Sequence, residues 1–176
     1  MPVTPIDATP GSAVANAYVT LAVADQYHLD RPAVGATWAD ASSDSKTAAI
    51  LWATKLLDSP SNWIWSEGYP TTPTQALLWP RAGVIKRNGW EYVPDSAVPI
   101  EVQHATAEYA RQLLVSDMAG NSDVETQGIK QITADVVTLI FKDGVKPKPV
   151  PDTVVYLIPT HWGYPAGRAP LVPVRT

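Results

Sequence analysis

Hydrophobic positions recur every three to four residues in three parts of the chain, and each part predicts a helix. The first runs from Leu21 to Leu29, where the hydroxyl of Thr20 can cap the free amides of the first turn. The second runs from Ser45 to Leu57, and the third from Ile100 to about Met118. We therefore expect three helices to form the body of the protein.

The second predicted helix is the most apolar of the three. One face contains residues at spacings of three and four, namely Ala49, Trp52, Ala53 and Leu56. Its other sides are also apolar, so we expect it to be buried nearly all round. Either Ser43 or Asp44 should cap its first turn, and Pro60 should end it.

The third predicted helix is the longest. Pro99 suits its first position because that position needs no backbone donor, and Gly120 with Asn121 supplies a stop signal. After it the apolar pattern changes to period two, which predicts one or two strands over residues 129–142. Residues 153–158 fit a short strand or a helical turn, and we favour the turn because Pro151 and Pro159 flank them.

Proline divides the chain into regions. None of the 17 prolines lies between Ile100 and Lys146, whereas seven lie between Pro147 and Pro173. Because proline breaks helix interiors and central strands, we expect a helical body over residues 1–120, a β element over 121–146 and an extended arm over 147–176. A chain that ends at Lys146 is accordingly expected to fold without the arm.

Residues 61–98 form a predicted loop that is rich in turns and aromatic side chains. Ordering so long a loop costs conformational entropy, which buried aromatic rings can offset. We therefore expect the loop to be pinned to the core. Its aromatic residues are Trp63, Trp65, Tyr69, Trp79, Trp90 and Tyr92.

Composition and charge exclude several classes of protein. The 176 residues include 13 Lys and Arg against 17 Asp and Glu, so the whole chain is not a basic nucleic-acid binder. The absence of cysteine excludes a disulfide framework and thiolate zinc sites. Residues 142–176 carry five bases against two acids, which gives an acidic body and a basic arm. With no membrane-spanning run and no basic leader, we expect a cytosolic, soluble product.

No assembled catalytic or metal site is visible in the sequence. The three histidines, His28, His104 and His161, each stand without a second ligand at helical or hairpin spacing. No nucleophile elbow or phosphate-binding glycine loop is present. We therefore expect no metal, no cofactor and no enzymatic activity.

Bases and aromatic residues alternate between Trp79 and Trp90, with Arg81, Lys86 and Arg87 between them. Aromatic side chains beside Lys and Arg are the means by which proteins grip single-stranded nucleic acid. The stripe is short, and Trp79 follows an apolar run that is typical of a buried turn. We favour a structural role for this segment over base stacking.

The segment from Thr72 to Val84, which contains Leu78-Trp79-Pro80-Arg81 and Gly83, resembles the hallmark of head-to-tail adaptor proteins of tailed bacteriophages. The similarity covers roughly residues 14–118 and includes Asn16-Ala17-Tyr18-Val19 and Val98-Pro99. This resemblance implies a small, mostly α-helical protein. Together with the patterns above it gives the expected fold, which is mainly α: a small helical bundle with a long aromatic-rich loop, a short strand or hairpin near 129–142, and an extended C-terminal arm.

The same resemblance implies a structural virion protein of the phage neck, assembled in the host cytoplasm. Such a protein forms a ring, usually of twelve copies, binds the portal protein and the next neck or tail protein, and lets DNA pass through its channel without specific binding. The expected docking residues lie in the arm: Tyr156, Leu157, Ile158, Trp162, Tyr164, Arg168, Leu171, Val172 and Arg175. The hallmark loop is expected to be structural.

A second interpretation remains open. The adaptor group overlaps a DnaT-like family of single-stranded-DNA-binding proteins, so the chain can also be a replication accessory protein. The salt dependence of oligonucleotide binding separates the two interpretations.

Overall fold

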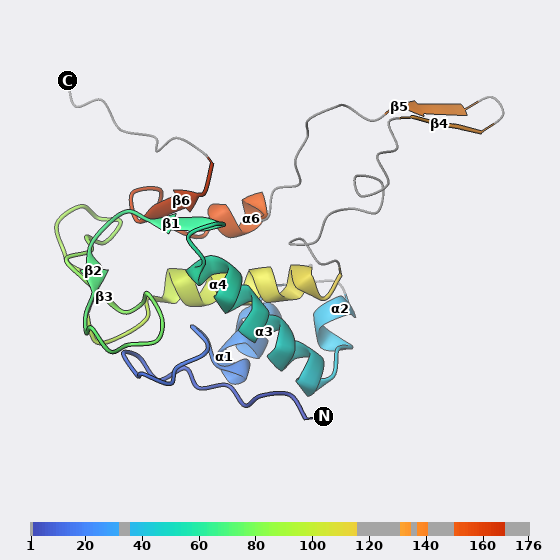
Figure 1. Ribbon diagram of the computed structural model, residues 1–176. Coiled ribbons are helices and arrows are strands. Elements are labelled where there is room, and N and C mark those ends of the chain that lie inside the picture. The colour runs from blue at the N-terminus through green and yellow to red at the C-terminus, as the bar shows by residue number, and fades with distance from the viewer. Residues whose placement is uncertain (1, 32–35, 116–130, 135–136, 141–149, 168–176) are drawn as a thin grey trace, which may run out of the picture.

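The computed structural model describes residues 2–31, 36–115, 131–134, 137–140 and 150–167. Five helices lie in these ranges, and Figure 1 shows α1, α3 and α4 together in the body of the molecule. The helices are α1 (Leu21–Leu29), α2 (Ala36–Ala39), α3 (Ser43–Asp58), α4 (Ile100–Leu113) and α6 (Asp152–Val155).

The helix starts follow the capping chemistry of the sequence. Thr20 caps α1, because its hydroxyl accepts a hydrogen bond from the amide of Val23 at 3.3 Å. Ser42 caps α3 through the amide of Ser45 at 3.1 Å, one residue before the expected caps. Pro99 is the N-cap of α4 and not its first residue. The predicted end of that helix near Met118 lies outside the described residues.

The core is centred where α3 packs against α4. Buried side chains of α3, such as Ile50 and Leu57, belong to the same cluster as Val102 and Tyr109 of α4. The expectation that α3 is buried nearly all round is wrong, because Ser45, Ala48, Trp52 and Lys55 form an exposed face. The spacing of apolar residues overestimates burial here, since alanine is small enough to lie on the surface at little cost.

Three antiparallel sheets of two strands each accompany the helices in the described residues. β1 (Trp63–Trp65) pairs with β6 (Gly163–Pro165), and β2 (Tyr69–Pro70) pairs with β3 (Arg81–Ala82). β4 (Gln131–Ala134) and β5 (Val137–Ile140) form the hairpin expected within residues 129–142. The fold is therefore a small domain that mixes helices and short sheets, and the mainly α expectation holds only loosely.

Four tryptophans pin the long loop to the core, as its composition predicts. Successive ring centroids are 5.6 Å apart for Trp63 and Trp65, 5.4 Å for Trp65 and Trp79, and 5.5 Å for Trp79 and Trp162. All four rings are buried. Such offset or edge-to-face pairs add to the stabilisation that burial of the rings provides.

The C-terminal segment differs from the extended arm that its prolines predict. Residues 150–167 fold back onto the body: α6 lies against α4, and β6 completes the sheet with β1 (Figure 1). Pro151 is the N-cap of α6, and Pro159 follows its end. Proline at such boundaries limits the length of regular elements without preventing burial. The predicted helical turn near 153–158 corresponds to α6.

None of the helices in the described ranges combines the length and the apolar character that crossing a membrane requires.

Candidate functional site

A small β-hairpin projects from the loop between β3 and α4. Ile85 and Tyr92 form its antiparallel bridge. The amide of Lys86 donates to the carbonyl of Glu91 at 2.7 Å, and the amide of Val93 donates to the carbonyl of Val84 at 2.8 Å. We call residues 85–92 the Trp90 hairpin, after the residue at its tip.

The turn of the Trp90 hairpin is held by its own polar groups. The amide of Gly89 donates to the carbonyl of Lys86 at 3.0 Å, and Gly89 has a φ of +86°, which glycine adopts without strain. The side-chain oxygen of Asn88 accepts from the amides of Trp90 and Glu91, both at 3.2 Å. The backbone of the tip is therefore fixed while its side chains remain outside the core.

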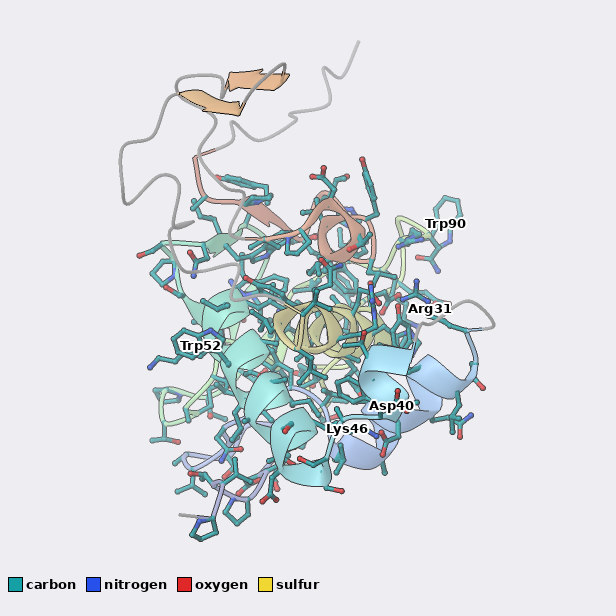
Figure 2. All side chains as sticks on the ribbon, turned by 90° about the vertical axis from the view of Figure 1, so that its right-hand side faces the viewer. Arg31, Asp40, Lys46, Trp52 and Trp90 are labelled. Atoms are coloured by element: carbon teal, nitrogen blue, oxygen red, sulfur yellow. The ribbon has the colours of Figure 1, made fainter. Side chains whose placement is uncertain are left out.

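The aromatic side chains of this hairpin face solvent. Trp90 is 82% exposed and Tyr92 is 65% exposed, whereas Trp79, which begins the same stretch of sequence, is 2% exposed. Figure 2 shows Trp90 projecting from the edge of the body on the same side as Arg31, with Trp52 on the opposite side. The hairpin therefore leaves two large aromatic side chains in solvent, which makes it a candidate contact surface.

Two cations accompany these rings. Lys86 forms an exposed ion pair with Glu91 at 2.9 Å, and its hydrogen bond lowers the pKa of the Glu91 carboxyl. Arg87 is exposed and has no carboxylate partner within the described part of the chain. The hairpin therefore combines two exposed aromatic rings with two cations. The guanidinium of Arg87 is available to an anion, whereas the ammonium of Lys86 is paired with Glu91.

The structure places the hallmark loop in the interior. Trp79, Pro80 and Arg81 are buried, Leu78 is half-buried, and Gly83 is exposed in the turn that leads to the hairpin. The guanidinium of Arg81 donates to the carbonyls of Glu67 at 2.9 Å and Gly68 at 2.6 Å. These contacts hold the loop together and leave Arg81 no surface for a ligand.

The expected docking residues are scattered by the fold. Ile158 and Trp162 are buried in the chain's own core, while Leu157 and Tyr164 are half-buried. Tyr156 is 79% exposed. The arm therefore does not present these side chains as one row of anchors. The remaining docking residues, Arg168, Leu171, Val172 and Arg175, lie outside the described residues.

His28 and His104 both contact the ring of Tyr27. His28 is buried, with its Nε2 3.1 Å from the carbonyl oxygen of Ala107, and burial lowers its pKa. His104 packs against the ring of Tyr27, and its partial burial also lowers its pKa. Within the described residues no group of three potential ligands is placed to hold a metal ion.

The sequence predicts a structural role for the whole stretch from Trp79 to Trp90. The structure separates its two ends, since Trp79 is buried and Trp90 is exposed. Asn88-Gly89 is the signal that could have found this difference, because that pair favours the turn of a hairpin and so lifts the next residue away from the core.

Comparison with protein families finds a match over most of the chain. A family model described as "Putative DnaT-like ssDNA binding protein" matches residues 6–162, which is more than half of the chain. A search among curated proteins found no match, and neither did a search among solved structures.

This match overturns the head-to-tail adaptor interpretation. The matched family is described by DNA binding and not by a place in a phage neck, so the resemblance of the Leu78-Trp79-Pro80-Arg81 segment was assigned to the wrong family. The ring of copies, the portal and tail partners, and the passage of DNA without specific contact were inferred from that assignment, and they are wrong with it. The finding favours the DnaT-like alternative.

Proposed function

Because the chain belongs to the family of putative DnaT-like ssDNA-binding proteins, we propose that it binds single-stranded DNA through the Trp90 hairpin. The observation that carries this assignment is the indole of Trp90, which is 82% exposed at the tip of a hairpin whose backbone is fixed. The role is binding alone and requires no catalysed reaction.

The chemistry of stacking supports single strands as the ligand. Bases of a single strand expose their faces, and each base that stacks on an aromatic side chain contributes about 1–3 kcal/mol to binding. Trp90 and Tyr92 offer two such faces, 82% and 65% exposed. In a duplex the base faces are covered by their neighbours, so the hairpin should prefer single strands.

The charges of the hairpin set the electrostatic part of binding. Arg87 can contact one phosphate, and Lys86 can contact a second when it leaves Glu91. The net charge of −4 over the whole chain adds no general attraction. With about two phosphate contacts, the logarithm of affinity should fall with the logarithm of salt concentration with a slope of about −1.4. Stacking therefore supplies most of the affinity.

A titration of the full chain into a labelled oligothymidylate of about 20 nucleotides, followed by anisotropy, tests the proposal. We expect Trp90→Ala to weaken binding about tenfold or more, because one stacked base is lost. Arg87→Gln should make the salt slope shallower by about 0.7.

Matched controls come from the opposite side of the molecule. Trp52 is 39% exposed on α3, and the ammonium of Lys55 lies 5.2 Å from its ring centroid, which reproduces an aromatic and cationic pair away from the hairpin. Trp52→Ala and Lys55→Gln should leave affinity and salt slope unchanged. Equal affinity of wild type and Trp90→Ala, or an equal loss in Trp52→Ala, would show that the hairpin is not the binding site.

A further inference from the structure

The outer edge of the Trp90 hairpin is formed by Ile85. The hydrogen bonds on either side of the Ile85 and Tyr92 pair run between their neighbours, from Lys86 to Glu91 and from Val93 to Val84. In an antiparallel sheet this pattern identifies Ile85 and Tyr92 as a non-hydrogen-bonded pair, in which the two residues share no backbone hydrogen bond. The amide and carbonyl of Ile85 therefore point away from the hairpin.

Three side chains from other parts of the chain form hydrogen bonds with the amide and the carbonyl of Ile85. The Oε1 atom of Glu67 accepts from the Ile85 amide at 3.1 Å. The carbonyl of Ile85 accepts from the Nε1 of Trp162 at 2.7 Å and from the Nε2 of His161 at 3.1 Å. We call Glu67, His161 and Trp162 the Ile85 clasp.

Ser66, which precedes Glu67 in the chain, connects the two parts of the clasp. The amide of Ser66 donates to the carbonyl of Trp162 at 2.9 Å, and the hydroxyl of Ser66 donates to the carbonyl of His161 at 3.0 Å. The Nε2 of His161 lies 3.7 Å from the second carboxylate oxygen of Glu67. The Trp162 ring is buried, so the clasp connects the hairpin to the core.

We propose that the Ile85 clasp is a positioning device that orders the Trp90 hairpin for DNA, an inference that rests on the proposed function. A two-stranded hairpin alone is marginally stable in water. The clasp holds the Ile85 strand of the hairpin in place when the protein folds. The tip is therefore already ordered before DNA binds, and binding does not have to bear the entropic cost of ordering it. Glu67, His161 and Trp162 thus act through Trp90 without touching the ligand.

Glu67 gives the sharpest test of the clasp. Glu67→Ala removes the acceptor of the Ile85 amide, whereas Glu67→Gln keeps an oxygen that can accept the same bond. We expect the alanine variant to bind oligothymidylate about fivefold more weakly, which corresponds to one hydrogen bond, and the glutamine variant to bind nearly as wild type. Heteronuclear NOE values of the amides of residues 86–91, measured without DNA, should fall in Glu67→Ala only.

A double-mutant cycle separates positioning from a direct contact. In a Trp90→Ala background, Glu67→Ala should cause a smaller loss of affinity than in the wild type, because the most exposed of the stacking residues that the clasp positions is gone. An equal loss in both backgrounds, or a hairpin in Glu67→Ala that is as ordered as in the wild type, would overturn the clasp. Wild-type affinity in Trp90→Ala would instead overturn the proposed function, and with it the purpose of the clasp.

Discussion

The indole rings of Trp79 and Trp162 pack against each other with their centroids 5.5 Å apart and their planes at 47°. Trp79 belongs to the long loop, and Trp162 lies just before β6 in the C-terminal segment. Both rings are buried. The C-terminal segment therefore contributes to the same core as the loop and the helices, and three predictions follow from the interior of this domain.

Removal of the Trp162 ring should cost far more stability than removal of an exposed ring. Trp162→Ala leaves a cavity beside Trp79 and removes a hydrogen bond to Ile85. We expect it to lower the free energy of unfolding by about 3–5 kcal/mol. Trp90→Ala, which alters an exposed side chain, should change it by less than about 0.5 kcal/mol. Urea unfolding measures both, and similar losses for the two variants would contradict this packing.

Truncation after Lys146 should prevent cooperative folding, contrary to the expectation drawn from the prolines. The cut removes β6, the ring of Trp162 and the buried side chains of Val150, Val154 and Ile158. Buried apolar side chains of this size contribute about 1.5–3 kcal/mol each, which together exceeds the margin of a small domain. A chain that ends after Gly167 keeps all these elements and serves as the control. Equal thermal transitions for the two truncated chains would contradict the role of residues 150–165.

Glu108 should make stability depend on pH in the acid range. Its buried carboxylate binds Arg31 of the α1 end and Arg111 of its own helix, the latter at 2.7 Å. Burial raises the pKa of Glu108, but the hydrogen bond and charge of Arg111, with the charge of Arg31, outweigh burial and hold the pKa below its ordinary value of 4.5.

The sign of this pH dependence follows from the lowered pKa. The unfolded chain takes up a proton on Glu108 at higher pH than the folded chain, so the stabilisation is complete above pH 4.5 and is lost as pH falls through the folded pKa. We expect Glu108→Gln to lower the free energy of unfolding by about 1.5–3 kcal/mol at neutral pH, since it weakens hydrogen bonds to charged groups. The variant should also lose less stability than the wild type as the pH falls below 4.5. Asp40→Asn, which alters an exposed carboxylate, should leave that limb unchanged.

The helical part of the fold could be predicted because its signals are local. Thr20 caps α1 as expected, and α3 begins within two residues of its predicted start. Such features depend on the residues within one turn of the helix. Ser42, Ser43 and Asp44 are nearly equivalent as caps, so only the tertiary packing of α3 decides which one is used.

The C-terminal segment could not be predicted because its partners are distant in sequence. The proline content correctly excludes long helices in this segment. It carries no information about whether the side chains of Ile158 and Trp162 are buried against the rest of the domain. The ring against which Trp162 packs is that of Trp79 in the loop. An extended arm and a folded segment therefore have the same proline pattern, and only the surrounding core distinguishes them.

Only part of the candidate site could be predicted from the sequence. Its residue types, Trp90 with Lys86 and Arg87, are those that bind single strands, but composition does not show which tryptophan of the stretch is buried. The Ile85 clasp could not be predicted, because the side chains of residues 67, 161 and 162 bind the main-chain groups of residue 85 and not another side chain. Main-chain acceptors occur at every residue, so no side-chain pattern marks them.

The bonds to Ile85 also protect the hairpin from strand-to-strand association. An outer strand with open main-chain groups is a template on which a second chain can extend the sheet. At Ile85 both groups are occupied by side chains of the same molecule. The Ile85 edge of the hairpin is therefore not offered to another copy of the chain as a place to add a strand.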